Sequence, residues 1–574
     1  MNKKSLSIVL GLFVLFLLLR LPGIHLPYHQ DEWKNVSASA SIEDAGKFFA
    51  HPPFQQVFFV AEHKIFGENG MRIPPVLFAL GAAILLYLIV RERAGKSAGV
   101  WSVFLFSLCY YNILGSLVPD VDGAVMPFFF LLALYAYGRF VATAGLHDSH
   151  ITSMKLSPVA WRWFLLLIVA LLAGFLVKLS FILVVGTIGL EYLWSHRTYL
   201  GLTKGSGVGR SVSMKRLGFV VLASVGFGIV YILILLVTEK VYPAFSISFM
   251  LGHAQQFSDA PGRNYVQIVV QTMKAIYYLS PLVVLLPFLV NKEIFKKTRD
   301  FWIYLIGGLL FYLVVVDFSA GALDKYLMFV IVPLCAIGGM VVAQIFSEPG
   351  RSKKVSVILG IILVAVLVAL NFLPHTVVPL YPKTEWFSRI LHGHWNVLTP
   401  FNGGSGPLGF YVSFLFIAFS YLVSIICVAA ALIRKKWKVS ALVILLLVGC
   451  VYNLVFTEEY IHGSLNGSAS AALAESVAYI SSHPSITQVM TYNDIGAQKL
   501  ENLGVYAGRF YAAPQFEEGH KTKFAEYKGE YLVIAIPPLY NGFYSVFFSK
   551  CDTLFETRSG TIVARVYSCK QALQ

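Results

Sequence analysis

Acidic residues in this chain gather at the ends of its long apolar stretches, where carboxylates could do acid–base chemistry beside a membrane. Asp31 and Glu32 follow the first stretch, and Asp120 and Asp122 precede a later one. Ionisable groups are costly inside a bilayer, so the places where a membrane protein keeps them are informative. A carboxylate at such a place can accept the proton of a reacting hydroxyl.

Cationic side chains are predicted on the same side of the membrane as these carboxylates. They are Lys34, Arg72 and Lys325, with His51 nearby. Such a set fits an interfacial site for a charged lipid headgroup, although each cation could also be an ordinary interface anchor. A proton-coupled transporter would instead place ionisable groups near mid-membrane on broken helices, and the middles of the apolar stretches are almost free of them.

The elements that must position these residues are membrane-spanning helices. Of the 574 residues, 57% are hydrophobic and 13% are charged, against about 25% charged in a typical soluble chain. The mean hydropathy is +0.70. The apolar runs have about 17 to 25 residues, enough to cross a hydrocarbon layer about 30 Å thick. We predict an all-α polytopic membrane protein with about thirteen spans, near 5–21, 73–90, 97–116, 119–138, 160–177, 179–195, 217–238, 275–291, 301–317, 325–346, 354–373, 408–433 and 439–457.

The net charge of +15 is explained by topology and does not indicate nucleic-acid binding. With the N-terminus inside, basic residues recur in each inside loop, for example at Arg91, Arg93 and Lys96 and in the run 434–438. This is the positive-inside pattern of membrane proteins. It places the N-terminus in the cytoplasm and the acidic cluster on the extracytoplasmic side.

The chain divides into a membrane domain, residues 1–457, and an extracytoplasmic tail, residues 458–574. Within the first, the outer loop 22–72 is predicted to form one or two amphipathic helices on the membrane surface. The tail alternates helical and strand-like runs, which predicts a small α/β domain.

Two cysteines, Cys551 and Cys569, flank two β-rich runs in the tail around a turn at 558–560. Folding that hairpin brings them nearly opposite, and an oxidising compartment would allow a disulfide. Two free thiols are the alternative.

Several short motifs together resemble the membrane glycosyltransferases of the GT-C class, above all protein O-mannosyltransferases and lipid A aminoarabinose transferases. They are the Asp31-Glu32 pair after the first span, His51-Pro52-Pro53, Arg72-Ile73-Pro74, Pro119-Asp120-Val121-Asp122 and Lys325-Tyr326. The similarity covers the first 140 residues well and the middle of the chain loosely. Lys325 stands where the family usually has an arginine, so the bidentate fork of a guanidinium is lost there.

The resemblance implies an enzyme that transfers a monosaccharide from a polyprenyl-phosphate donor to a hydroxyl outside the membrane, with inversion. Asp31 would be the general base; its alternative role is to cap a surface helix. Glu32 would orient the acceptor or hold Lys34, unless it is only a solvated carboxylate. The donor phosphate would contact Lys34, Arg72, Lys325 and Tyr326.

The same resemblance places the protein in the plasma membrane of a prokaryote, with the active site and the tail outside. The acceptor could be a lipid, a glycan or a protein.

Asp120, Asp122 and His51 could hold a divalent cation or contact the acceptor. Oxygen ligands favour Mg²⁺ or Mn²⁺, whereas aspartates that only cap the fourth span would need no metal.

Two other functions are compatible with the sequence. A transporter or flippase for a lipid-linked sugar would need similar lipid contacts but no catalytic base. A non-catalytic membrane scaffold would depend on its tail and would tolerate loss of the acidic cluster.

Overall fold

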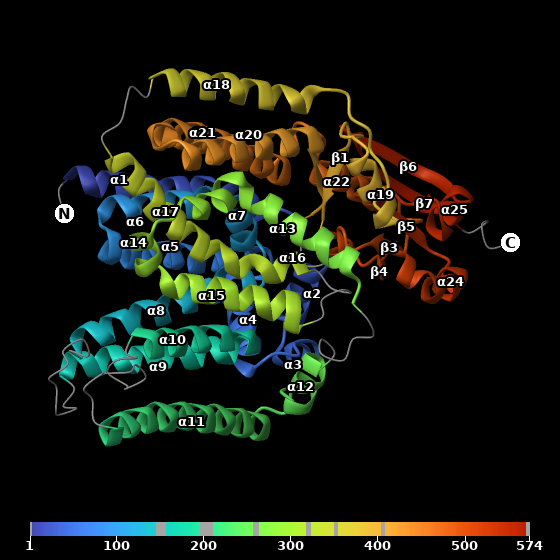
Figure 1. Ribbon diagram of the computed structural model, residues 1–574. Helices are drawn as coiled ribbons and strands as arrows, with labels where there is room; N and C mark the ends of the chain where they lie inside the picture. The colour runs from blue at the N-terminus through green and yellow to red at the C-terminus, as the bar shows by residue number, and fades with distance from the viewer. Residues whose placement is uncertain are drawn as a thin grey trace.

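The computed structural model describes residues 3–144, 157–195, 210–255, 263–316, 323–348, 354–402 and 408–569. Most of them form a body of helices running side by side, and a small sheet domain stands at one end (Figure 1). We call this end of the body the outer end. Helix α1 (Lys3–Leu18) begins at the opposite end.

Nine helical segments among the described residues have the length and hydropathy of membrane spans, and a bent pair of helices makes a tenth if it is one span. The all-α membrane fold is thereby confirmed, but the predicted count of about thirteen is not. Two of the missing spans form shorter helical segments: α10 (Ile182–Ser195) follows the 3-10 turn Leu179–Phe181, and α15 (Arg299–Leu310) continues into the π-helical turn Phe311–Val315. The nine segments are Ser7–His25, Glu68–Ala94, Val121–Thr143, Pro158–Val177, Tyr265–Leu289, Asp324–Ser347, Lys354–Phe372, Phe414–Ile433 and Lys435–Ile461.

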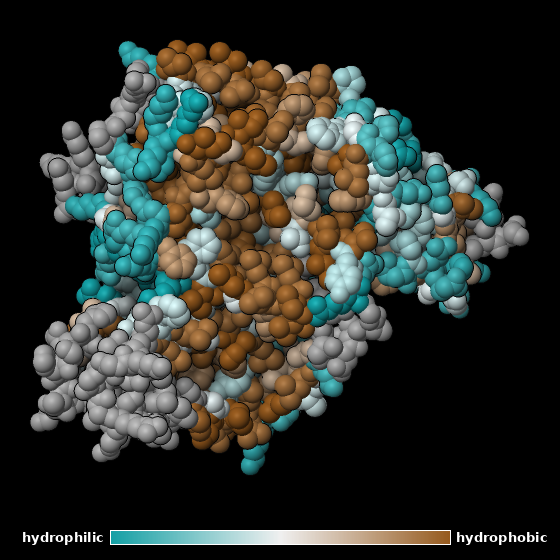
Figure 2. Space-filling model, viewed as in Figure 1, coloured by the Kyte–Doolittle hydropathy of each residue, from teal (hydrophilic) through white to brown (hydrophobic). Residues whose placement is uncertain are grey.

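Figure 2 shows the corresponding surface: an apolar band covers the helices, and hydrophilic residues cover the sheet domain and the far end of the body. Other helices of the body are α5 (Ile73–Ala94), α8 (Met126–Thr143), α9 (Pro158–Val177), α11 (Arg210–Val241), α12 (Ile247–Gln255), α13 (Tyr265–Leu285), α14 (Lys292–Lys297), α16 (Leu323–Tyr326), α17 (Ile331–Ser347), α18 (Lys354–Ala369), α20 (Phe414–Ile433) and α21 (Lys438–Ile461).

Helix α17 lies at the centre of the body, in the span Asp324–Ser347, of whose most apolar stretch 89% is buried. It packs closely on α6 (Lys96–Leu108), and a Cβ at Gly339 would lie 2.1 Å from the Ser102 hydroxyl. Small residues let helix backbones approach in this way within a membrane. In contrast, α11 and α18 lie along opposite edges of the body (Figure 1).

The bent pair consists of α6 and α7 (Tyr110–Leu117), which meet at Cys109 at an angle of 64°. The bend leaves backbone groups unpaired, and a membrane interior requires other partners for them. The Tyr110 N–H donates to Asn453 Oδ1 at 2.7 Å, and the Asn112 amide donates to the Phe106 carbonyl. The bend directs α7, and the aspartates that follow it, toward the outer end.

The loop predicted as one or two surface helices contains three: α2 (Asp31–Ala38), α3 (Ile42–Phe48) and α4 (Pro53–Phe66). Proline at the first position of α4 is well placed, because the N–H that it lacks would have no partner inside the helix.

A second outer segment forms α19 (Lys383–Leu391) and a hairpin of β1 (Leu398–Phe401) and β2 (Phe410–Ser413).

The C-terminal domain is an α/β sheet domain with its own hydrophobic core, as predicted. Its sheet has the strand order β4-β3-β5-β7-β6, in which β3 is parallel to β4 and β5 and the other two pairs are antiparallel. The elements are α22 (Ala469–Ser481), β3 (Val489–Tyr492), α23 (Ala497–Asn502), β4 (Tyr506–Phe510), α24 (Glu517–Glu526), β5 (Glu530–Ile534), α25 (Phe543–Ser549), β6 (Asp552–Ser559) and β7 (Ile562–Ser568).

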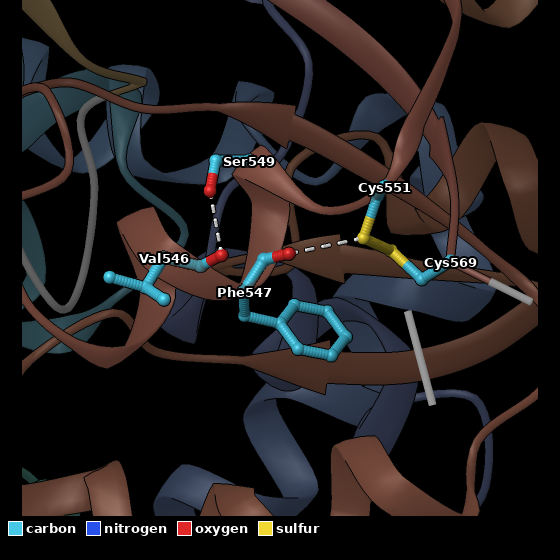
Figure 3. The surroundings of a disulfide bond; sticks show 5 residues. All are labelled: Val546, Phe547, Ser549, Cys551 and Cys569. Atoms are coloured by element: carbon cyan, nitrogen blue, oxygen red, sulfur yellow. Dashed lines mark hydrogen bonds between the residues drawn. A yellow bond between two sulfur atoms is a disulfide. The ribbon is translucent and has the colours of Figure 1, made fainter. Parts of the chain in front are cut away.

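The last two strands form the hairpin expected from the sequence, and a disulfide joins Cys551 to Cys569 (Figure 3). The register pairs Asp552 with Ser568, so each cysteine lies one residue beyond this pair. Of the two alternatives, free thiols or a bridge, the structure contains the bridge.

Candidate active site

Helix α2 presents Asp31, Glu32 and Lys34 where the helical body meets the C-terminal domain. It follows Gln30, whose backbone lies at φ 48° and ψ −115°, a conformation that costs a non-glycine residue about 1–3 kcal/mol. The Gln30 N–H donates to the Asn493 carbonyl of the C-terminal domain at 3.2 Å. Both acidic residues lie in the first turn, where the helix dipole favours negative charge.

Glu32 and Arg72 form a fully buried ion pair, and both side chains are 0% exposed. The guanidinium Nη1 lies 2.6 Å from Glu32 Oε1, and Nη2 lies 3.1 Å from Oε2. It also donates to the carbonyls of Leu26, Pro27 and Leu117. We call this the closed pair.

The closed pair changes the roles expected for both residues. All guanidinium nitrogens of Arg72 are occupied by protein oxygens, so the structure does not offer this side chain to a donor phosphate. Glu32 is neither solvated nor paired with Lys34, and it accepts a further hydrogen bond from the His29 N–H. The pair instead ties α2 to α5 and α7.

Asp31, next to Glu32 in the chain, belongs to a partly exposed row of charges. Its Oδ1 lies 2.6 Å from Lys34 Nζ, and its Oδ2 lies 3.8 Å from Lys325 Nζ. Lys325 also contacts Asp120 Oδ2 at 2.9 Å. Exposure falls along the row from 32% at Asp31 to 18% at both lysines and 10% at Asp120. We call these four residues the open chain.

Asp120 stays ionised at the inner end of the open chain. Burial acts to raise its pKa, but the ammonium groups of Lys325 and Lys178 outweigh burial and lower the pKa to about 2. Its Oδ1 also accepts from the Val121 N–H at 2.6 Å, which caps the next helical segment. Asp120 therefore takes the capping role that the sequence offered as the alternative to metal binding, and it forms an ion pair as well.

Asp122 pairs with a lysine that the sequence did not single out. Lys178 Nζ lies 2.7 and 2.5 Å from its two carboxylate oxygens, and both side chains are about nine-tenths buried. The available signal was that Lys178 is the one charged residue between Arg162 and Glu191. A lone charge in so long an apolar stretch requires a partner.

Two glycines permit this arrangement of aspartates. The backbones of Gly115 and Gly123 pack so closely that a Cβ on Gly123 would lie 2.3 Å from the Gly115 carbonyl oxygen. Any side chain at either position would push the segment with Asp120 and Asp122 away from α7.

Tyr326 and His51 line a cavity of about 130 Å³ beside the Lys178 ammonium. The ammonium lies 4.5 Å from the centre of the Tyr326 ring, within the range of a cation–π contact. Burial, and then the charge of Lys178, lower the pKa of His51 to about 3, so its imidazole is neutral at physiological pH.

The geometry does not support the divalent-cation site that the sequence suggested at Asp120, Asp122 and His51. Within the described ranges, no three His, Cys, Asp or Glu side chains lie close enough together to hold a metal ion. The two carboxylates face the ammonium groups of Lys325 and Lys178 instead.

A cleft of about 370 Å³ opens beside the start of α2, lined by both the helical body and the C-terminal domain. Gln30, adjacent to Asp31, forms part of its wall, as does Tyr511, whose ring lies 5.8 Å from the Lys34 ammonium. Lys274 of α13 also lines it and pairs with Asp324 at 3.2 Å. The site therefore has a partly exposed carboxylate and cations, with a cavity at Lys178 and a cleft at Gln30.

The helical body, the three helices after the first span and the α/β domain over the outer end define a polytopic membrane protein with an α/β domain at one end of its helices. No protein-family model and no curated protein sequence matches the chain.

Among solved structures, the chain resembles ArnT from Cupriavidus metallidurans. It matches ArnT bound to undecaprenyl phosphate with a TM-score of 0.53 and 14% identity, over 99% of this chain and 98% of that one. For apo ArnT the TM-score is 0.51, with 15% identity over 98% of each chain. At these identities the likeness shows the fold, which confirms the resemblance to the aminoarabinose transferases drawn from the motifs.

Proposed function

We propose that the chain is a glycosyltransferase that moves a monosaccharide from a polyprenyl-phosphate donor to a hydroxyl of an extracytoplasmic acceptor, with Asp31 as general base. The observation that carries the proposal is the open chain: a partly exposed carboxylate with two ammonium groups within 4 Å. The ArnT structure with bound undecaprenyl phosphate supports the choice of donor.

In the proposed step, the acceptor hydroxyl donates a hydrogen bond to the partly exposed Asp31 carboxylate. The hydroxyl oxygen attacks the anomeric carbon as its proton passes to Asp31. The bond from the anomeric carbon to the phosphate oxygen breaks on the opposite face, so the configuration inverts. Polyprenyl phosphate leaves with the bonding electrons.

The leaving phosphate gains negative charge, which fixed cations stabilise in a partly dry site. Lys325 is suited to this task because it is shared between Asp31 and Asp120 and remains 18% exposed. Lys178 and Tyr326 line the adjoining cavity and are the next candidates. Arg72 takes no part, because the closed pair occupies it.

We further propose that the outer end lies outside the plasma membrane, with the N-terminus in the cytoplasm. The basic inside loops and the disulfide between Cys551 and Cys569 support this orientation, since such bonds persist in oxidising compartments.

The test uses the purified protein in lipid with radiolabelled polyprenyl-phosphate sugars and a membrane extract as acceptor. Asp31→Asn is expected to lower the transfer rate by about 10²–10⁴-fold, the usual contribution of a positioned general base, while donor binding persists. The matched control is Glu43→Gln on α3, an exposed carboxylate that pairs only with Lys47 among the described residues. It should transfer at the native rate.

Other outcomes have different meanings. Equal rates in the native protein and Asp31→Asn would remove Asp31 as the base and leave a transferase. Normal donor binding without turnover by any donor–acceptor pair would instead favour a flippase or transporter of the lipid-linked sugar.

A further inference from the structure

The cleft beside α2 has the size of a small-molecule site and an unusual lining. Its volume of about 370 Å³ falls within the range of about 300–1,000 Å³ for ligand pockets. Amide side chains from the body and the C-terminal domain dominate its polar wall: Gln30, Gln267, Gln271, Asn402, Asn493 and Gln515.

Two of these amides have unused hydrogen-bonding capacity. Gln30 Oε1 and Gln271 Oε1 are buried and have no hydrogen-bond partner among the described residues. An amide presents both a donor and an acceptor, so it can bond a hydroxyl in either sense. Buried polar groups placed to meet a ligand hydroxyl discriminate strongly against ligands without one. A wall of amides therefore suits a ligand with many hydroxyl groups.

Aromatic rings provide the apolar part of the same wall. Tyr381, Tyr492 and Tyr511 line the cleft, and Phe516 lies with them. The flat face of such a ring carries partial negative charge, and the C–H groups on one face of a sugar ring are weakly positive. Amides and tyrosines in one cleft thus match the two surfaces of a carbohydrate.

Lys383 adds a charge that the protein itself does not balance. It lines the cleft at the start of α19, and its ammonium lies 5.3 Å from the centre of the Tyr381 ring. No carboxylate of the described residues forms an ion pair with it, whereas the other lysine of the cleft, Lys274, pairs with Asp324. A half-buried cation in this situation is suited to an anionic group of a ligand.

We propose that this cleft binds the acceptor, and that the acceptor is a carbohydrate bearing a phosphate or carboxylate group that meets Lys383. The inference rests on the proposed transferase function, because it makes the cleft the acceptor side of Asp31. Gln30 connects the two, since it lines the cleft and immediately precedes Asp31. The carbohydrate could belong to a glycolipid or to a free polysaccharide, which share this chemistry.

Binding is tested apart from transfer with the full-length protein in lipid nanodiscs. The probe is an array of neutral, phosphorylated and uronic-acid-containing oligosaccharides. We expect the protein to prefer anionic glycans about tenfold, equivalent to one charge-assisted contact. Lys383→Gln should lose this preference, Lys383→Arg should keep much of it, and Lys528→Gln, an exposed lysine of the C-terminal domain, should match the native protein.

Equal binding of neutral and anionic glycans, or no change in Lys383→Gln, would overturn the role of Lys383. Binding of peptides in place of glycans would overturn the acceptor class. Asp31→Asn should still bind the anionic glycans, because Asp31 is not part of the cleft wall. If the native protein bound these glycans but transferred no sugar to them, the transferase proposal would be refuted and the cleft assignment would stand.

The transfer assay distinguishes the two possible acceptors, a glycolipid and a free polysaccharide. A glycolipid and the same glycan released from its lipid are offered as acceptors to the native protein and to Lys383→Gln. Transfer to the glycolipid alone assigns a lipid-linked acceptor, and equal transfer to both assigns a free glycan. In either arm, Lys383→Gln should raise the acceptor KM about tenfold and leave kcat unchanged; a fall in kcat alone would contradict a binding role.

Discussion

The closed pair and the open chain begin at adjacent residues of α2, Glu32 and Asp31, and they differ in burial and in how fully each charge is neutralised. Glu32 is 0% exposed and pairs with a guanidinium at 2.6 Å, whose other N–H groups donate to backbone carbonyls. Asp31 is 32% exposed, and one of its two lysines lies 3.8 Å away and is shared with Asp120. The first arrangement fixes α2 in place, and the second leaves charges that a substrate can contact.

Lys383 extends the comparison to a third cation. Arg72 is fully balanced, Lys325 is shared between two carboxylates, and Lys383 has no ion-pair partner among the described residues. The capacity to bind an anion from outside rises in this order. Burial and partner geometry therefore indicate function better here than residue type or position in a motif.

The largest effect is expected from breaking the closed pair. Arg72→Met would leave the Glu32 carboxylate buried without its cation, which typically costs about 3–5 kcal/mol. The variant should unfold at a much lower temperature in detergent, or fail to accumulate. The measurement is the thermal unfolding of purified protein, compared with Asp31→Asn, which should lie close to the native value because Asp31 is partly solvated.

A double variant shows whether Arg72 acts through Glu32. Removing both charges in Glu32→Leu/Arg72→Met should recover part of the lost stability, because no unpaired charge remains buried. A stable Arg72→Met protein that has lost only donor binding would instead restore the phosphate-binding role that the sequence suggested for Arg72.

The next effect concerns Lys325 in the open chain. Lys325→Gln should raise the donor KM about 10- to 100-fold, the loss of a hydrogen bond to a charged group. Lys325→Arg should retain most donor affinity, since it keeps the charge and can form a bidentate contact with phosphate. The assay is donor-dependence of transfer at saturating acceptor. If both the donor KM and kcat were unchanged in Lys325→Gln, the phosphate role would pass to Lys178 and Tyr326.

The comparison also shows what the sequence could reveal. Runs of apolar residues and the bias of basic residues identified a membrane protein, and ordered motifs at the span ends indicated the GT-C fold. Two predicted spans, 179–195 and 301–317, do form helical segments, Leu179–Ser195 and 299–315, but these are shorter than the nine helices that have the length of a span. Hydropathy located these helices but did not decide whether each one crosses the membrane.

Site residues were harder to place, for a physical reason. Arg72 and Lys325 look alike in sequence, each a cation at a span end, and only the three-dimensional partners separate a buried tie from an open charge. Lys178 meets Asp122 across 56 positions, and the cleft joins Gln30 to the distant Asn493 and Tyr511. Contacts of such separation depend on how the helices and the C-terminal domain pack, which local patterns do not specify.

The smallest effect is a pH dependence specific to Lys383. Burial, and then the charge of Lys274, lower the pKa of Lys383 to about 8, while Asp324 of α16 acts in the opposite direction. The ammonium is therefore charged below pH 8 and lost above it. Between pH 7 and pH 9 the acceptor KM for an anionic glycan should rise by about tenfold at most, because one charge-assisted contact disappears.

Two controls assign this pH dependence to the cleft. Lys383→Gln should show a high and flat acceptor KM over the same interval, and Lys383→Arg should be flat and low because a guanidinium stays charged. The donor KM, which depends on the open chain, should not follow the same curve. A rise in the acceptor KM that persists in Lys383→Arg would instead show that a group other than Lys383 titrates, and would contradict the assignment of the anionic contact to Lys383.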